Sequence, residues 1–548
     1  MRLLENTKWT LLTRRVLLFN CFTDNFALKY LPTMVKRFLN QLFLQKNLFI
    51  IAFIFIFLAK FPTLFHYFNT PNGYVFVKQA SWFDAWDVNA YVSYIRYGQN
   101  YGMMLQNTYT TIPHQGVFVF QLYTFLGIAN RLFHLDPFLI FHLTSIIVNV
   151  FLVASVFFLI KQLIGNNKDK IPVLLVILLG GGLGFLPQFI GNSAEMVTPD
   201  FNFIKPFNIP HDALSILLTI FSLGLFYLFS QTSQKKDIIL AVLAGFGSAV
   251  FHPYKLLWLI LVGFVIAVIN KNKFKSLISY PVSLIILFLI YFPFAFYPFI
   301  NSPGFAGIAN EKFINTNPIS LLLGLGFLVV PAAWSLFNTD TEKEKIMFVG
   351  TILIVQLILL FAPFVYARQF IPTIFVWVAL LAYFGIKDML IKYSYRFALW
   401  AGVLLCAISP IYIFFNLLTI KPTNQFYFLT KQEGEMINKA NSLPRQSGIL
   451  SLYRIGNYLP AMTDNKVYFG HYYQTPDSVN TLIKAENFYY KLNEKEQKAF
   501  LQDNHIDYIY YGLEEAKVRG MFNLNTDNPF PYFKIVYQVG PIILYSAK

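Results

Sequence analysis

A succession of apolar runs is the feature that most constrains the fold of this chain, because eleven of them follow one another before residue 420. A helix needs about 20 consecutive, mostly apolar residues to cross the hydrocarbon core of a bilayer. The runs cover residues 47–68, 137–164, 171–190, 212–230, 238–250, 256–270, 277–300, 319–337, 346–364, 371–386 and 397–420. We therefore predict an all-α polytopic membrane domain of about 11 transmembrane helices.

The composition excludes an ordinary soluble enzyme. Of the 548 residues, 56% are hydrophobic and only 13% are charged, whereas about 25% of the residues of a typical soluble chain are charged. The net charge of +16 would raise the question of nucleic acid in a soluble domain. In a membrane protein the first question about such a net charge is which loops hold the basic residues. We predict the lipid bilayer as a partner and no nucleic acid.

The distribution of charge predicts the orientation of the chain. If the basic arm at 1–46 is cytoplasmic, the arm and the inner loops hold 21 basic and eight acidic residues, and the outer loops up to residue 420 hold seven of each. Cytoplasmic loops of membrane proteins are enriched in Lys and Arg. The chain also lacks an Asn-x-Ser/Thr sequon, which favours a bacterial plasma membrane over the endoplasmic reticulum. We predict a multi-pass plasma-membrane protein whose N-terminus is cytoplasmic.

One further stretch, residues 117–135, is nearly long enough to span a membrane, but it contains Gln121, Asn130 and Arg131. Counting it as a span would reverse every later loop and destroy the asymmetry of charge. We therefore interpret it as an interfacial or re-entrant helix on the outer side. The membrane domain then covers 47–420 and includes a long first outer loop at 69–136.

The tail at 421–548 has 14 basic and 12 acidic residues, a balance typical of a soluble domain. Short β-like runs at 448–453, 466–469, 506–511, 533–539 and 542–545 alternate with polar helical stretches at 478–490 and 493–503. Asn493 and Glu496 have the spacing of a capping box. We predict a small C-terminal α/β domain on the extracytoplasmic side.

The N-terminal arm and the cysteines carry little functional information. Residues 1–46 lack a compact apolar core followed by a small-residue cleavage site, so they do not predict a cleavable signal. Translation starting at Met34 instead of Met1 is an open alternative. Cys21 and Cys406 lie too far apart in sequence to indicate a disulfide framework or a metal site.

Unusual polar residues gather on the predicted outer side of the membrane domain. They are Asp84, Asp87, Arg96, His114, Asp200, His211, His252 and Arg368. Within the spans the one clear charged candidate is Lys60, whose side chain could reach toward an interface or mark an internal path. The concentration at one face suggests a site there.

Asp84 and Asp87 lie about 14 residues after the first span, in the run Trp-Phe-Asp-Ala-Trp-Asp. Carboxylates at this spacing share one side of a helical turn. One of them could accept a proton from a hydroxyl while the other orients it or binds a cation. The structural alternative is that Asp87 caps the helix expected over 88–97.

His211 and His252 each lie at the predicted outer mouth of a span and could donate to a phosphate or anchor the chain at the level of the lipid headgroups. Arg368 is the one basic residue at the outer end of its two spans. A guanidinium is suited to phosphate recognition, and contact with lipid headgroups is its alternative role.

This layout resembles the GT-C glycosyltransferases, including the protein mannosyltransferase and aminoarabinose transferase branches. The first-loop run from Asp87 to Tyr91 is similar to that of uncharacterised bacterial GT-C-like membrane proteins. Further matches follow along the chain: Arg96, Gly98, Asn107, Tyr109 to Thr110, His114 to Gly116, Tyr123, Gly127, Gly180 to Gly184, Pro210 to His211, His252 to Tyr254, Arg368, Pro372, Gly456 to Asn457, Leu459 to Ala461, Gly470 to His471, Thr475 and Lys484. The resemblance covers nearly all of the chain after the arm.

The resemblance implies transfer of a sugar from a polyprenyl-phosphate donor to a glycan, lipid or protein acceptor at the outer face. It implies Asp87 as the general base with Asp84 as its partner. The substrate-binding residues that follow are Arg368, His211, His252, His114, Tyr254, Arg96 and Asp200. No cofactor is certain; a divalent metal, Mg or Mn, held by Asp84 and Asp87 is left open, because the chain has Asp-x-x-Asp where many relatives have adjacent acids or Asp-x-Asp.

Two other functions stay open at this point. A lipid or solute transporter would also need many spans, but it should carry polar or broken-helix features at mid-membrane depth, which the sequence hardly shows. A catalytically silent GT-C relative could act in envelope glycan assembly. The sequence does not distinguish the sugar, the acceptor or the oligomeric state.

Overall fold

The computed structural model describes residues 46–189, 191–310, 316–338, 342–363, 365–390, 394–522, 524 and 529–547. In this part of the chain, seven helices are long and apolar enough to cross a membrane, and α11 is a shorter apolar helix. The predicted arm lies outside the described residues except for Lys46. Residues up to Phe55 form a unit of their own, of which the described part is the exposed, apolar first half of α3.

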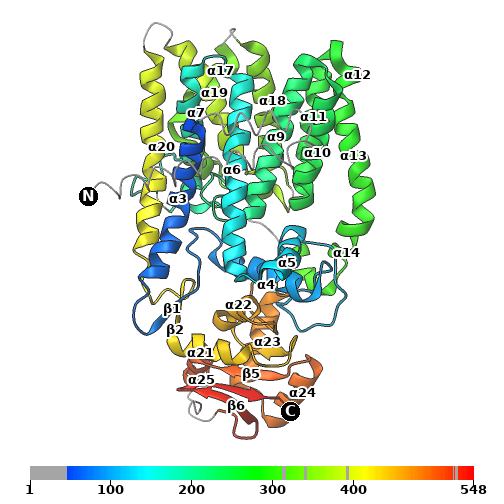
Figure 1. The fold of residues 1–548 in the computed structure, drawn as a ribbon, viewed down its shortest axis with the longest axis vertical. Helices are drawn as coiled ribbons and strands as arrows, with labels where there is room; N and C mark the ends of the chain where they lie inside the picture. Colours follow the sequence, from blue (N-terminus) through cyan, green and yellow to red (C-terminus); the bar gives the residue numbers. More distant parts are fainter. Residues whose placement is uncertain are drawn as a thin grey trace, which may run out of the picture. The chain divides into compact units, whose positions relative to one another are not determined.

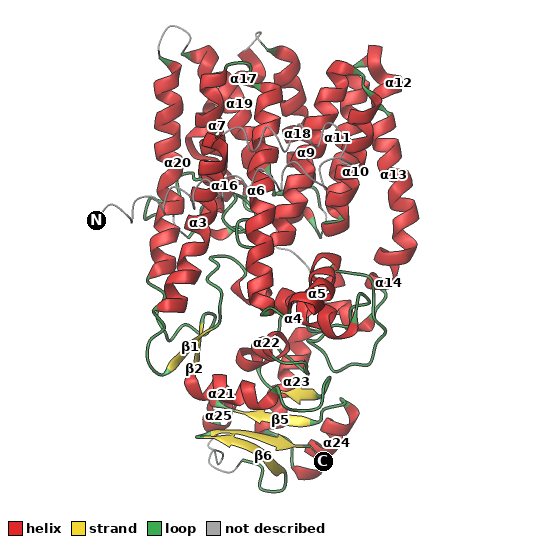
Figure 2. Cartoon of the chain, in the orientation of Figure 1, coloured by secondary structure: helices red, strands yellow, loops and turns green. Residues whose placement is uncertain are grey.

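Helices dominate the described residues between 46 and 420 (Figures 1 and 2). The helices at the predicted spans are α3 (Lys46–Phe68), α6 (Pro137–Leu163), α7 (Asn167–Leu179), α9 (Pro210–Thr232), α10 (Lys235–Phe251), α11 (Tyr254–Ile269), α13 (Ser279–Tyr291), α16 (Pro318–Leu325), α17 (Val329–Asn338), α18 (Lys343–Phe361), α19 (Ile374–Met389) and α20 (Tyr395–Leu418). Short elements connect them: α8 (Ala194–Val197), η1 (Lys271–Lys273), α12 (Phe274–Leu277), η2 (Phe292–Phe296), α14 (Tyr297–Ile300), η3 (Pro303–Phe305), α15 (Ala306–Ala309), η4 (Gly326–Leu328) and η5 (Ala367–Phe370). Every predicted span overlaps a helix, and the number of crossings stays a prediction.

The predicted span at 171–190 is wrong over its second half. Helix α7 ends at Leu179, Gly180 adopts the left-handed conformation with φ of 58°, and turns follow to residue 189. A Cβ on Gly182 would lie 2.2 Å from the carbonyl oxygen of Gly324. The run is apolar because it packs against other parts of the protein, and hydrophobicity alone does not distinguish such a segment from a helix.

The first loop forms two crossed helices, α4 (Ala85–Tyr101) and α5 (Gln121–Phe133). Helix α5 lies where the interfacial or re-entrant helix was predicted. The two helices meet at glycines: a Cβ on Gly127 would lie 2.0 Å from the oxygen of Ile95, and a Cβ on Gly98 would lie 2.3 Å from the oxygen of Thr124. Only hydrogen at these positions permits the close approach, which positions the C-terminal half of α4 against α5.

The tail is an α/β domain, as predicted. Its elements are α21 (Lys431–Ala440), β3 (Gly448–Leu450), α22 (Tyr453–Met462), β4 (Lys466–Val467), α23 (Ser478–Tyr490), α24 (Glu494–Asp503), β5 (Tyr508–Tyr511), α25 (Leu513–Met521), β6 (Lys534–Val539) and β7 (Ile542–Ser546). The strand order is β4-β3-β5-β7-β6; β3 pairs in parallel with β4 and β5, and the other pairs are antiparallel. The capping box of Asn493 and Glu496 is confirmed.

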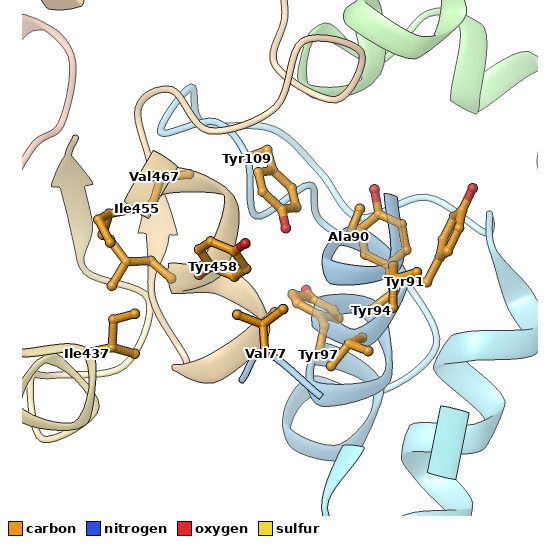
Figure 3. Packing of buried hydrophobic residues seen from close by; sticks show 14 of the residues in the cluster. Val77, Ala90, Tyr91, Tyr94, Tyr97, Tyr109, Ile437, Ile455, Tyr458 and Val467 are labelled. Atoms are coloured by element: carbon orange, nitrogen blue, oxygen red, sulfur yellow. The ribbon is translucent and has the colours of Figure 1, made fainter. Parts of the chain in front are cut away.

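The tail and the first loop share one hydrophobic core. Strand β1 (Tyr74–Phe76) of the loop pairs with β2 (Phe428–Thr430) at the start of the tail. Figure 3 shows Tyr91, Tyr94 and Tyr97 of α4 in one cluster with Ile437, Ile455, Tyr458 and Val467 of the tail. Loop and tail therefore support each other's position, although the paired strands β1 and β2 are more than 300 positions apart in sequence.

Candidate active site

A cavity of about 1180 Å³ lies where the first loop, the segment at 197–212 and several helix ends converge. Seven predicted site residues line it: Asp84, Asp87, Asp200, His211, His252, Tyr254 and Arg368. They come from positions between 84 and 368, so the fold rather than the local sequence brings them together. The structure thus brings these seven residues into one cavity, and the location of the cavity at the outer face stays a prediction.

Lys205 stands among three carboxylates at the polar end of this cavity. Its Nζ lies 2.9 Å from Oδ2 of Asp84, 3.0 Å from Oδ2 of Asp200 and 3.2 Å from Oδ2 of Asp212. The lysine side chain is 10% exposed. Burial alone would lower the pKa of Lys205, but the charges of Asp200, Asp212 and Asp84 outweigh it and hold the pKa well above its usual value. The ammonium is therefore a permanent positive charge.

Burial also changes the acids around Lys205. It raises the pKa of Asp200 to about 6, helped by the charge of Asp212 and opposed by Lys205. Burial likewise raises the pKa of Asp84, although Lys205 counteracts it. Several carboxylates share a single ammonium, so not all of them gain a full counter-charge.

Asp84 reaches Lys205 because of its backbone. It precedes α4 in the left-handed conformation, with φ of 51°, and its side chain does not cap the helix. This conformation is costly for a residue with a side chain. Asp87 lies inside the first turn of α4, so the alternative that Asp87 caps this helix is wrong. The two acids, three residues apart, thereby acquire different neighbours.

Asp87 is paired with a residue of the tail. Its Oδ1 lies 2.9 Å from Nε2 of His471, which is fully buried. The backbone N–H groups of Tyr473 and Gln474 both donate to Nδ1 of His471. Because Nδ1 accepts, the imidazole must carry its proton on Nε2, which faces Asp87. The tail thus fixes the tautomer of His471 and places its Nε2 close to the Asp87 carboxylate.

The two cavity histidines converge on Asp212. Its Oδ1 lies 3.2 Å from Nε2 of His211 and 2.9 Å from Nε2 of His252. The hydroxyl of Tyr123 lies 2.6 Å from Nδ1 of His211, and that of Tyr254 bonds to Nδ1 of His252. Each imidazole is therefore oriented from both sides.

These contacts decide which residues fit a divalent metal. Asp84 pairs with Lys205 and Asp87 with His471, so the two acids do not converge on one position for an ion. His211, Asp212 and His252 offer ligand atoms that all lie within 4.8 Å of one another. Tyrosine hydroxyls at the outer ring nitrogens are partners of the kind that orient histidine ligands. This group fits a transition-metal ion, whereas Lys205 already supplies the positive charge among the carboxylates.

Lys60 of α3 supports the segment that carries Lys205. Its buried ammonium donates to the backbone oxygen of Asn208 at 3.3 Å. Whether Lys60 reaches toward an interface or marks an internal path stays a prediction. Lys60 stabilises the loop at 198–209 next to the site.

Two predicted binding residues lie outside the cavity. His114 packs against Phe305, and its Nε2 accepts from the backbone N–H of Asn107. Arg96 donates from Nε to the oxygen of Ala461 at 3.1 Å, and its Nη1 lies 3.7 Å from Asp464. Both side chains hold the first loop in place, and Arg96 holds it against the tail.

Sequence reasoning missed Lys205, Asp212 and Tyr123 as members of the site. Lys205 was one of several outer cations without a distinguishing pattern. Asp212 adjoins His211, so the pair of neighbouring polar residues at a span mouth was an available signal. Tyr123 lies in a stretch matched by the family resemblance, but nothing in the sequence indicates its contact with His211.

The sequence matches no protein-family model, and a comparison with curated proteins likewise gives no match. The fold is similar to that of a solved membrane enzyme, the archaeal oligosaccharyltransferase AglB of Archaeoglobus fulgidus. Its form tethered with an acceptor peptide containing the NVT sequon has a TM-score of 0.50 and 14% identity, covering 85% of this chain and 70% of that chain.

The same enzyme in the apo form has a TM-score of 0.50 and 13% identity, with coverage of 88% of this chain and 73% of that chain. Its complex with an inhibitory peptide and a dolichol-phosphate has a TM-score of 0.49 and 13% identity, with coverage of 92% and 75%. At these identities the likeness concerns the fold, and the chemistry must be argued from the side chains of this chain.

Proposed function

We propose that this chain transfers a sugar from a polyprenyl-phosphate donor to an acceptor at the outer face of the membrane. The observation that carries the proposal is the composition of the cavity. Asp84, Asp87, Lys205 and Arg368 line its polar part, and apolar residues of α13 and α14 such as Phe288 and Ile300 line another part. A donor with a charged phosphate and a long apolar chain matches both surfaces.

In the proposed reaction, Asp87 removes the proton from the acceptor group while the nucleophilic atom of the acceptor attacks the anomeric carbon of the sugar. The bond between this carbon and the phosphate oxygen breaks, and polyprenyl phosphate leaves with the electron pair. His471, whose Nε2 lies 2.9 Å from Oδ1 of Asp87, packs beside this base. Placing base, acceptor and donor in one cavity replaces random encounters with an oriented reaction.

The departing phosphate needs positive charge nearby. Arg368 is the guanidinium of the cavity, and its charge reaches Asp84. If a divalent ion takes part, His211, Asp212 and His252 would hold it, and it would supply Lewis acidity toward the phosphate. Lys205 keeps the cluster of acids from repelling the donor.

The membrane orientation predicted from the sequence is part of this proposal. Helix α12, in a predicted inner loop, and the sheet of the tail lie at opposite ends of the helical bundle (Figure 1). With the basic loops cytoplasmic, the cavity and the tail face the outside of a plasma membrane. Labelling of Asp503→Cys in intact cells, in a Cys21→Ser and Cys406→Ala background, should be complete; protection until lysis would contradict this orientation.

The Asp87→Asn variant tests the proposed function. In membranes supplied with a panel of radiolabelled polyprenyl-phosphate sugars, turnover should fall by about 10²–10⁴-fold, the range for loss of a general base. Asp503→Asn, an exposed acid on α24, is the matched control and should leave turnover unchanged. Full turnover by a folded Asp87→Asn protein would exclude Asp87 as the base, and no turnover of any donor by the wild type would reject the function.

A further inference from the structure

A second cavity, of about 1250 Å³, lies between the first loop, α15 and the tail. It shares Trp86, Asn310 and Tyr473 with the cavity that holds Asp87. Trp86 is the residue directly before Asp87. The second cavity therefore adjoins the candidate active site and extends along the tail.

Four aromatic rings follow one another along this second cavity. Ring centroids are 5.4 Å apart between Trp86 and Phe426, 6.5 Å between Phe426 and Tyr453, and 4.8 Å between Tyr453 and Tyr472. We call these four residues the aromatic track. Tyr472 remains 47% exposed and the neighbouring Tyr473 42% exposed. Apolar rings that folding leaves open to solvent and gathers in a groove are typical of a binding surface.

The polar residues of the second cavity are acids and uncharged groups. Asp477, Glu514, Asn310 and Gln425 line it, and no Lys or Arg is among its described lining residues. Carboxylate and amide oxygens accept hydrogen bonds from hydroxyl groups. The aromatic faces carry partial negative charge and attract polarised C–H groups. Flat aromatic rings beside hydrogen-bond acceptors suit a neutral chain of sugars. Because the described lining holds no cations, it disfavours a substrate that carries phosphate or carboxylate groups.

We propose that the aromatic track binds the acceptor of this enzyme, and that this acceptor is a carbohydrate chain without acidic groups. Its end would pass Trp86 and present a hydroxyl to Asp87, while the preceding sugars stack on Phe426, Tyr453 and Tyr472. This inference rests on the proposed function for the identity of the acceptor. Binding to the track can nevertheless be measured without any turnover.

The probe is an array of neutral and acidic oligosaccharides of bacterial envelope type, applied to the purified full-length protein in detergent. We expect saturable binding of neutral members and at least tenfold weaker binding by Tyr472→Ala. Phe522→Ala, an exposed aromatic residue of the same domain outside the cavity, is the matched control and should bind like the wild type.

Three results would overturn the proposal: no binding to any member, binding that Tyr472→Ala and Tyr453→Ala leave unchanged, or preference for acidic members. Saturable binding of a peptide with the Asn-Val-Thr sequence, weakened by the same variants, would overturn it in favour of a protein acceptor. Oligosaccharide binding without turnover of any donor would reject the proposed function and leave the binding site standing. Transfer to a non-carbohydrate acceptor without oligosaccharide binding would reject the binding site alone.

Discussion

The two first-loop acids, Asp84 and Asp87, have very different surroundings although three positions separate them. Asp84 belongs to an ionic cluster in which Lys205 contacts three carboxylates. Asp87 faces a single imidazole, whose proton is placed by the tail. Asp84 is engaged in an ion pair with Lys205, whereas the ionic contact of Asp87 within the described residues is with His471. The comparison favours Asp87 for the chemistry and Asp84 for the electrostatics.

Removing the charge of Lys205 should have the largest effect. Lys205→Met leaves three buried carboxylates without their ammonium, and breaking such a buried pair typically costs about 3–5 kcal/mol of stability. Thermal unfolding in detergent should show a fall in Tm of many degrees, together with loss of turnover. Lys78→Met, which removes an exposed pair with Asp136, is the control. A Tm within a degree of wild type would contradict the role of Lys205 as counter-charge.

The same variant tests what Lys205 does to metal binding. With its ammonium gone, oxygens of Asp84, Asp200 and Asp212 become available to a hard cation. Mn²⁺ affinity of Lys205→Met, measured by electron paramagnetic resonance, should rise at least tenfold over wild type. Equal affinity would show that Lys205 does not compete with an ion at these carboxylates.

The proposed role of Asp87 depends on His471 of the tail. His471→Ala removes the N–H that orients Asp87 and should lower kcat by about 10–100-fold, with little change in KM. His471→Gln, whose amide can donate, should recover part of the loss. A purely structural role of His471 would lower the amount of folded protein in both variants and leave kcat per folded molecule unchanged.

The ionic cluster around Lys205 predicts a dependence of stability on pH. The pKa of Asp200 is raised from 3.8 to about 6 in the folded protein, so the folded state holds this proton more tightly than the unfolded state. Stability is then highest near pH 4 and declines as the pH rises through 6. Asp200→Asn should flatten this decline by about 1–2 kcal/mol, measured as the difference in unfolding between pH 4.5 and 7. A steeper decline in the variant would reverse the assignment.

Arg96 should give the smallest effect. Arg96 contacts Ala461 and Asp464 instead of the cavity, so Arg96→Lys should change turnover less than about threefold while lowering Tm slightly. The matched variant Arg368→Lys, at the cavity, should reduce turnover far more, because an ammonium cannot reproduce a guanidinium's paired donors. Equal losses in the two variants would show that Arg96 also acts on the substrate.

Much of the fold was predictable because its determinants are local. The apolar runs predicted the positions of the helices, and Asn493 with Glu496 predicted a helix start that the structure confirms. The run at 171–190 failed as a helix after Leu179, since a buried irregular segment and a spanning helix have the same hydrophobicity. The tail helices α21, α22 and α25 were not predicted, because their short amphipathic segments resemble loops in sequence.

The candidate site was predictable only in part. Polar side chains in an apolar chain are conspicuous, so Asp84, Asp87, His211, His252 and Arg368 could be selected from the sequence. The residues that contact them could not be selected in this way. Lys205 is an ordinary outer cation until the loop at 198–209 folds, and His471 reaches Asp87 across 384 positions of sequence.

The sequence by itself determined a membrane chain, because hydrophobicity, charge bias and capping residues act over a few neighbouring positions. Only the tertiary structure decided which acid meets a lysine and which meets a histidine. That choice depends on the left-handed conformation of Asp84, on the glycine crossing of α4 and α5, and on the pairing of β1 with β2. These contacts join distant segments, and their energies depend on burial and distance, which no local pattern of residues encodes.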